Sequence, residues 1–134
     1  KPLNDAHGHL YGDECLRELA RICTRFANGA DDLVARFGGE ELVLLLPGRD
    51  LQAAAALAEE VRREVEAIAM PHDNSQVAPI VTVSAGVSAV RPSHALSPER
   101  LIDAADRALY AAKAAGRNRV VRYAGTAAEA GAAA

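Results

Sequence analysis

Apolar residues recur at helical spacing in three parts of the chain, and each part has the start or stop signals of a helix. The first predicted helix runs from Gly12 to a stop at Asn28. The second predicted helix begins after Asp50. Asp50 is predicted to cap it, because an Asp side chain can accept a hydrogen bond from a free backbone N–H of the first turn. The third begins after the cap Ser97, with Pro at its first position, and ends at Gly116.

Stretches rich in Val, Ile and Leu predict strands between these helices. They are residues 32–46, residues 80–88 and residues 119–123. In the first, Gly38 and Gly39 predict the centre of a type I′ hairpin turn, where both central residues need positive φ. In the second, Gly86 allows a close backbone approach or a bulge. The order of elements predicts an α/β (α+β) fold, with helices flanking a central, mostly antiparallel sheet.

Composition narrows the classes of protein that fit this pattern. With 134 residues, half of them hydrophobic and a quarter charged, the chain fits one globular domain. No apolar run reaches membrane-spanning length, no signal peptide is visible, and a net charge of −3 gives no reason to expect nucleic-acid binding. Cys15 and Cys23 lie roughly 12 Å apart along one predicted helix, too far to pair. Free thiols fit a reducing cytoplasm.

The hairpin is the candidate site, because two adjacent carboxylates follow its glycines. Glu40 and Glu41 stand at the mouth of a strand that is otherwise apolar. A strand built only for stability gains nothing from such a pair, whereas a metal or phosphate site needs hard oxygen ligands beside bare backbone. Arg36 is expected to face solvent or to pair with one of the two carboxylates.

Two further groups of polar residues have a structural interpretation beside a functional one. The first is a cluster expected just before the first helix, where capping and turns favour such residues. Its members are Asn4, Asp5, His7, His9 and Asp13. The second is Lys113 and Arg117, one helical turn apart at a helix C-terminus. Cations there complement the helix dipole by roughly 0.3–1 kcal/mol, or they can grip an anion.

Together these residues fall into four ordered blocks, which resemble the GGDEF family of diguanylate cyclases over about positions 1–123. The blocks are Lys1-x-x-Asn4-Asp5-x-x-Gly8-His9-x-x-Gly12-Asp13-x-x-Leu16, Arg36-Phe37-Gly38-Gly39-Glu40-Glu41-Leu42, Thr82-Val83-Ser84-x-Gly86-Val87 and Ala105-Asp106-x-Ala108-Leu109-Tyr110-x-x-Lys113-x-x-Gly116-Arg117-Asn118. The resemblance implies a palm-like nucleotidyl cyclase fold. It also implies condensation of two GTP into cyclic di-GMP with loss of two pyrophosphates. The alternative is an inactive module that binds GTP for regulation or dimerisation.

The resemblance also implies roles for residues that contact the base and the reacting groups. Asn4 and Asp13 match the positions that hydrogen-bond guanine, and His9 matches a position close to the substrate. Glu40 matches the metal-binding carboxylate, which is also proposed as the base for the attacking hydroxyl. Glu41 matches the second acidic position. The implied cofactor is Mg²⁺, or Mn²⁺ in its place.

Other matched positions concern the phosphates. Gly38 and Gly39 match a turn whose lack of side chains lets phosphates approach the backbone. Lys1, Lys113 and Arg117 match phosphate-contacting positions, which favours the anion-gripping interpretation of the last two.

The sequence departs from the family pattern in three places. The leading strand Asp-x-Asp-x-Phe, which carries the other metal carboxylate, is absent before Lys1, and we expect it to precede the sequence given. The inhibitory Arg-x-x-Asp motif is degenerate, with Gly29 in place of Arg and Asp32 kept, which predicts weak or absent product inhibition. Leu42 replaces a Phe, with little effect expected.

The resemblance finally implies the organisation of the protein. Residues 1–124 are expected to be the GGDEF domain without its N-terminal strand, and residues 125–134 a disordered tail. The expected partners are GTP, a second copy of the domain and an N-terminal sensor domain. Neither nucleic acid nor direct membrane contact is expected. A cytoplasmic location follows, although the parent protein could be membrane-anchored.

Overall fold

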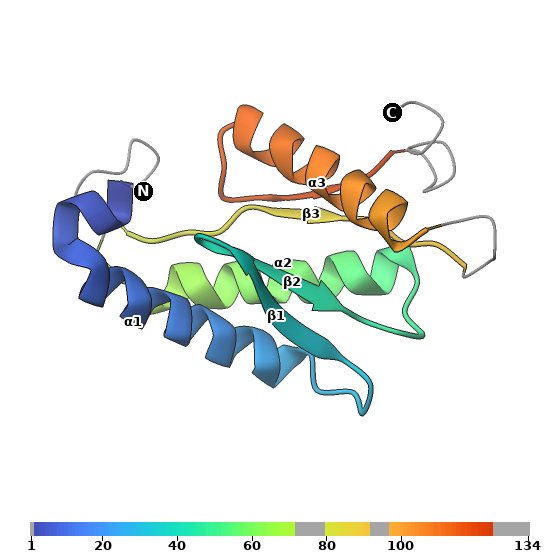
Figure 1. Ribbon diagram of the computed structural model, residues 1–134, viewed down its shortest axis with the longest axis horizontal. Coiled ribbons are helices and arrows are strands. Elements are labelled where there is room, and N and C mark those ends of the chain that lie inside the picture. Colours follow the sequence, from blue (N-terminus) through green and yellow to red (C-terminus); the bar gives the residue numbers. More distant parts are fainter. Residues whose placement is uncertain (1, 72–79, 92–96, 125–134) are drawn as a thin grey trace. The chain divides into compact units, whose positions relative to one another are not determined.

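The computed structural model describes residues 2–71, 80–91 and 97–124, with the backbone alone for residues 2–11 (Figure 1). The elements along the chain are α1 (Pro2–Phe26), β1 (Leu33–Gly38), β2 (Glu41–Leu45), α2 (Leu51–Ile68), β3 (Ala85–Val87), α3 (Pro98–Ala114) and β4 (Val120–Arg122). This mixture of helices and strands confirms the predicted fold class. Within the described residues, no helix is both long and apolar enough to cross a membrane.

The chain divides into two compact units, which are described separately. The first holds residues 1–48 and 63–82, and the second holds residues 49–62 and 83–134. The division falls within α2, whose N-terminal two thirds belong to the second unit. The expected tail and Lys1 lie outside the described residues, as does most of the loop expected between Pro71 and Pro79.

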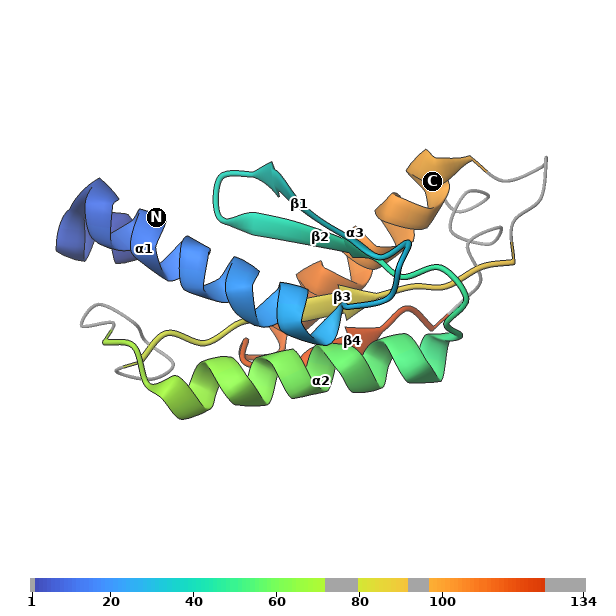
Figure 2. The ribbon, with the colours of Figure 1, turned by 90° about the horizontal axis from the view of Figure 1, so that it is seen from below.

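In the first unit, α1 lies alongside the hairpin of β1 and β2 (Figure 2). The two strands pair antiparallel, with Leu33 opposite Leu45 and Arg36 opposite Leu42. The apolar side of α1 supplies buried Cys15, Ile22 and Cys23. The antiparallel hairpin predicted for residues 32–46 is therefore confirmed.

Helix α1 begins earlier than its apolar pattern predicts. The sequence placed the polar cluster of residues 4–13 before the helix, but these residues lie inside it. Pro is well tolerated in the first turn of a helix, so Pro2 can open it. Gly8 and Gly12 each weaken a helix by about 1 kcal/mol relative to Ala, but neither ends it.

In the second unit, β3, α3 and β4 form a β-α-β unit, with α3 packed on both strands. The two strands run parallel, with Gly86 opposite Val121, because a helical crossover returns the chain in the same direction. The sheet pairing is thus divided: one antiparallel pair and one parallel pair among the described strands. Buried Ala104, Ala108 and Ala112 line the face of α3.

The strand predicted over residues 80–88 is shorter in the structure. Only Ala85–Val87 forms a ladder, because β4 offers a partner over three positions. Residues 80 and 81 pair instead with the segment after α2: Ile80 bridges Pro71, and the Val81 N–H donates to the Met70 carbonyl over 2.7 Å. Strand residues without a backbone partner do not form a ladder.

Gly86 confirms the close approach that the sequence predicted. A Cβ atom at this position would lie 2.1 Å from the Ala105 carbonyl oxygen and 2.2 Å from the Leu109 nitrogen. Both atoms belong to the backbone of α3, so they cannot rotate away. The absence of a side chain at residue 86 lets α3 and β3 pack in direct backbone contact.

Candidate functional site

The hairpin turn is the first part of the candidate site. Gly38 pairs with Glu41 in the ladder, so the two residues of the turn are Gly39 and Glu40. The prediction of a type I′ turn centred on both glycines was wrong by one residue. The pairing shifts between Arg36 and Gly38, and this bulge moves the turn along the chain. Gly39 has a φ of +49°, a conformation that glycine adopts without steric cost.

Arg36, on the strand β1 that leads into the turn, holds the turn closed. Its guanidinium donates two hydrogen bonds to the Gly39 carbonyl oxygen, from Nε over 3.0 Å and from Nη2 over 2.7 Å. The Arg36 side chain is exposed, in line with the expectation that it faces solvent. Two charge-assisted bonds to one carbonyl fix the direction of the peptide group that precedes Glu40.

The two carboxylates flank the end of the turn. Glu40 lies in the turn and is exposed, whereas Glu41 is the first residue of β2 and is half-buried. Among the residues whose side chains are described, no group of three or more His, Cys, Asp and Glu could hold a metal. Two adjacent carboxylates nevertheless fit Mg²⁺, which takes one or two of them and completes its shell with substrate phosphates and water.

A cavity of about 320 Å³ lies between α1 and the hairpin, all within the first unit. Its α1 wall is formed by residues at i, i+3, i+4 and i+7, which share one face of a helix. They are Asp13, Leu16, Arg17 and Ala20. Its hairpin wall is formed by Val34, Ala35, Arg36 and Leu42.

The lining of this cavity combines three kinds of group. The carboxylate of Asp13 can accept N–H donors, the guanidinium groups of Arg17 and Arg36 can attract an anion, and the remaining residues are apolar. The volume lies at the lower end of the range for small-molecule pockets. Such a lining suits a planar base with N–H donors and a charged tail. Arg17 was not singled out from the sequence as a lining residue. Its position one helical turn after Asp13 could have indicated that the two side chains share a face.

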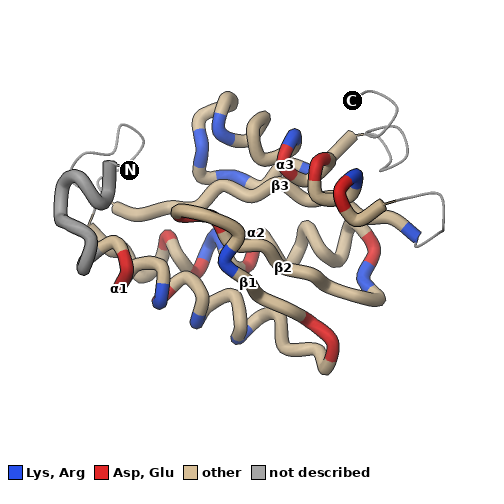
Figure 3. Tube along the Cα trace, viewed as in Figure 1, with Lys and Arg blue, Asp and Glu red and all other residues tan. Residues whose placement is uncertain are grey.

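A second group of cations lies at the C-terminal end of α3 (Figure 3). Lys113 is in the last turn of the helix and is exposed. Arg117 follows the helix, is exposed and has a φ of +64°. Its backbone N–H donates to the Ala112 carbonyl over 3.0 Å, and the Gly116 N–H donates to the Lys113 carbonyl over 3.3 Å. These bonds fold the chain back over the helix end and bring the two cations into one turn region.

The segment that leads into β1 forms a closed turn. Oδ2 of Asp32 accepts the Gly29 N–H over 2.8 Å, and the Asp32 N–H donates to the Gly29 carbonyl over 3.1 Å. A Cβ atom at residue 29 would lie 3.0 Å from the Asp32 carboxylate. The retained Asp32 therefore caps its own turn.

The structure thus groups some of the predicted site residues and leaves others aside. Asp13 lines the cavity, Gly38, Gly39, Glu40 and Glu41 form the hairpin end, and Lys113 and Arg117 share the turn after α3. Asn4 and His9 lie in the first half of α1, where the side chains are not described.

Comparisons with known proteins identify the family to which the sequence is similar. A family model described as "Diguanylate cyclase, GGDEF domain" matches residues 1–119. Diguanylate cyclase A of Treponema denticola is 41% identical over 123 residues, which are 90% of this chain and 31% of that protein. The response regulator PleD of Caulobacter vibrioides is 42% identical over 122 residues, 90% of this chain and 26% of that protein. The chain spans less than a third of either relative.

Solved structures give the same result. The active GGEEF domain of a diguanylate cyclase from Vibrio cholerae superposes with a TM-score of 0.79 at 30% identity, covering 92% of this chain and 76% of that one. The GGDEF domain of DgcB from Caulobacter crescentus, solved in complex with c-di-GMP, has a TM-score of 0.78 at 32% identity, covering 92% and 71%.

Proposed function

This chain belongs to the GGDEF family, and we propose that it is a diguanylate cyclase domain, which condenses two GTP into cyclic di-GMP and two pyrophosphates. The observation that carries the proposal is the hairpin turn: two glycines followed by two carboxylates, beside a cavity lined by Asp13. An inactive module that binds GTP for regulation is the less favoured alternative, because Glu40 and Asp13 retain the chemistry that turnover and base recognition need.

Recognition of the base is assigned to the cavity. The Asp13 carboxylate accepts the N1–H and N2–H donors on the guanine edge, and Asn4 reads the same base through its amide. His9 stands close to the substrate. The apolar lining of the cavity contacts the flat faces of the ring, and adenine, which lacks these two donors, binds less well.

Binding of the phosphates is assigned to three groups of residues. Gly38 and Gly39 leave the hairpin backbone bare, so phosphate oxygens can approach its N–H groups. Lys113 and Arg117 supply positive charge from the turn after α3, and Lys1 is proposed as a further cation that contacts the phosphates.

The reaction is a phosphoryl transfer that occurs twice for each product. The 3′-hydroxyl oxygen of one GTP bonds to the α-phosphorus of the other, and the bond from that phosphorus to the bridging oxygen of the β-phosphate breaks. Glu40 accepts the hydroxyl proton, and pyrophosphate leaves. Glu40 and Glu41 would hold a divalent cation, Mg²⁺ or Mn²⁺. Such a cation neutralises the phosphates and the charge on the leaving group.

The proposed partners follow from this chemistry. Each domain holds one GTP, so a second copy must meet the first face to face. An N-terminal sensor domain would control that meeting. GTP as substrate and the buried thiols of Cys15 and Cys23, which form no disulfide, favour a cytoplasmic location.

A Glu40→Gln variant provides the first test. It keeps the shape of the side chain but removes the base and a cation ligand, so product formation should fall at least about a hundredfold. The purified protein is incubated with GTP and Mg²⁺, and cyclic di-GMP is measured by chromatography and mass spectrometry.

Glu60→Gln is the matched control, because Glu60 is an exposed carboxylate on α2 with no proposed role. Undiminished product from Glu40→Gln would remove Glu40 from its role. A wild-type protein that binds GTP but forms no product would support the inactive module instead.

Product inhibition through residues 29–32 is proposed to be weak or absent. Gly29 offers no guanidinium to a bound product, and Asp32 already accepts the Gly29 N–H. Steady-state rates measured with added cyclic di-GMP should therefore not fall at about micromolar concentrations, where ordinary specific sites are half filled. Micromolar inhibition that disappears in Asp32→Asn would contradict this.

A further inference from the structure

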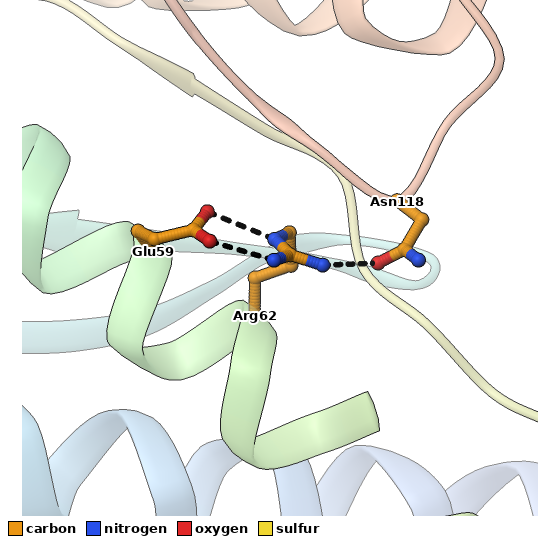
Figure 4. Close-up of polar contacts among 3 residues, drawn as sticks. All are labelled: Glu59, Arg62 and Asn118. Carbon is orange, nitrogen blue, oxygen red and sulfur yellow. Dashed lines mark hydrogen bonds and ion pairs between the residues drawn. The ribbon is translucent and has the colours of Figure 1, made fainter. Parts of the chain in front are cut away.

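A polar link joins α2 to the turn that follows α3, within the second unit. Arg62 of α2 forms a two-bond ion pair with Glu59, from Nε to Oε1 over 2.8 Å and from Nη2 to Oε2 over 2.6 Å. Its remaining Nη1 donates to Oδ1 of Asn118 over 2.9 Å, as Figure 4 shows. The Arg62 side chain is 16% exposed, so water competes little with these bonds. The geometry uses three donors of the planar guanidinium at once, which Lys could not reproduce.

Asn118 belongs to a turn with an unusual backbone. Gly116, Arg117 and Asn118 have φ of +123°, +64° and +48°, so three successive residues are left-handed. Glycine adopts this region freely and Asn tolerates it, but for Arg it costs free energy that the surroundings must offset. The chain therefore needs fixed contacts to hold Arg117 in this conformation.

Hydrogen bonds from several elements supply such contacts. The Asn118 N–H donates to Ser84 Oγ over 3.2 Å, and the Arg117 N–H donates to the Ala112 carbonyl. Nε of Arg119 donates to the Arg117 carbonyl over 3.0 Å. The Asn118 side chain accepts a hydrogen bond from Arg62, a residue of α2 that lies 56 positions away in the sequence.

We propose that Arg62 is a positioning residue for Arg117. Glu59 fixes the guanidinium of Arg62, Arg62 fixes the amide of Asn118, and the amide fixes the left-handed path of residues 116–118. That path sets the direction in which the Arg117 side chain leaves the backbone toward a substrate phosphate. The inference rests on the proposed function, since the phosphate contact of Arg117 is part of it.

The test is a double-mutant cycle between Arg62→Met and Arg117→Met in the purified protein. Met keeps an apolar stem and removes the guanidinium. Arg62→Met alone should raise the KM for GTP about tenfold, as misplacement of a substrate-positioning group does. In the Arg117→Met background the same change should leave the KM unaltered. Arg100→Met, an exposed arginine of α3, is the control and should not change the KM.

Two further measurements separate positioning from general stability. Asn118→Gly leaves the left-handed backbone accessible and removes the side chain whose carbonyl oxygen accepts from Arg62, so it should raise the KM as Arg62→Met does. It decides the question if Arg62→Met fails to fold. The backbone N–H of residue 118 donates to Ser84 Oγ in the wild type. Its hydrogen exchange should speed up in both variants, Arg62→Met and Asn118→Gly, without any nucleotide present.

The outcomes distinguish the two levels of inference. An active wild type in which Arg62→Met raises the KM equally with and without Arg117 would overturn the positioning role and leave the cyclase proposal intact. An unchanged KM in Asn118→Gly would also overturn it. A wild type that neither binds GTP nor forms cyclic di-GMP would overturn the proposed function, and the positioning role with it.

Discussion

Cys23 lies on the buried side of α1, with 3% of its surface exposed. Burial raises the pKa of its thiol from 9.0 to about 11, because the thiolate would lose its hydration. The thiol is therefore neutral at physiological pH and a poor nucleophile. Cys15 is buried on the same helix, and neither cysteine forms a disulfide. Both act as small apolar residues of the first unit.

This burial predicts an alkaline loss of stability. Below pH 9 the thiol is protonated in both states, so it has no effect on the pH dependence. Between pH 9 and about 11 the unfolded chain releases the proton while the folded chain keeps it. The free energy of unfolding should therefore fall by up to about 1.4 kcal/mol per pH unit over this window.

Urea unfolding at pH 8.0 and pH 10.5 checks this, with Cys23→Ala as the matched variant. Cys23→Ala should be less stable at pH 8 because it leaves a small cavity, but it should lose less stability on going to pH 10.5. An equal loss in both proteins would show that other groups cause the alkaline effect.

At the scale of elements, local chemistry was a good guide to where helices begin. Asp50 caps α2, since its Oδ1 accepts the Ala53 N–H over 2.8 Å. Ser97 caps α3, since its Oγ accepts the Arg100 N–H over 3.3 Å from an extended backbone. Both caps were predicted because their partners lie three residues away. Gly116 was predicted to end α3 because glycine readily adopts the left-handed backbone that follows a helix, and it does follow the helix with a positive φ.

The cap at Asp50 predicts a measurable loss of stability. Asp50→Ala leaves the Ala53 N–H without its acceptor and should lower the free energy of unfolding by about 1 kcal/mol. Asp50→Asn keeps an acceptor and should stay within about 0.5 kcal/mol of the wild type. Urea unfolding of the three proteins compares them. Equal losses in both variants would mean that charge at residue 50, and not capping, stabilises α2.

Elements that depend on distant partners were predicted less well. The extent of β3 is limited by β4, and the parallel pairing arises from the crossover through α3. The hairpin turn lies one residue later than predicted, because a bulge after Arg36 changes the register of the two strands. Two adjacent glycines are compatible with either register. The bond between Arg62 and Asn118 had no signal in the sequence, because 56 residues separate them.

At the scale of the whole molecule, the residues with proposed roles occur in both units of the chain. Asp13, Glu40 and Glu41 belong to the first, whereas Lys113 and Arg117 belong to the second. The motifs could be recognised from the sequence because each is short and continuous. The cavity could not, since it needs α1 and the hairpin side by side.

The proposed mechanism predicts that activity depends on protein concentration. In that mechanism one domain holds one GTP and the reaction needs two copies. The specific activity should therefore fall when the protein is diluted below its dimerisation constant. Cyclic di-GMP formation is measured over a dilution series, and the oligomeric state is followed by analytical ultracentrifugation at the same concentrations. Full specific activity from a monomeric protein would contradict the two-copy mechanism.

The backbone contact at Gly86 has a consequence for how this domain can vary. A Cβ atom there would meet peptide groups of α3 at about 2 Å, and even Ala would force the helix off the strand. In a library that randomises every codon, position 86 should therefore keep glycine alone. Position 38, where a Cβ atom would meet nothing within 4 Å, has no such steric limit, so any preference for glycine there would report selection on the activity. The two glycines thus separate the demands of packing from those of catalysis.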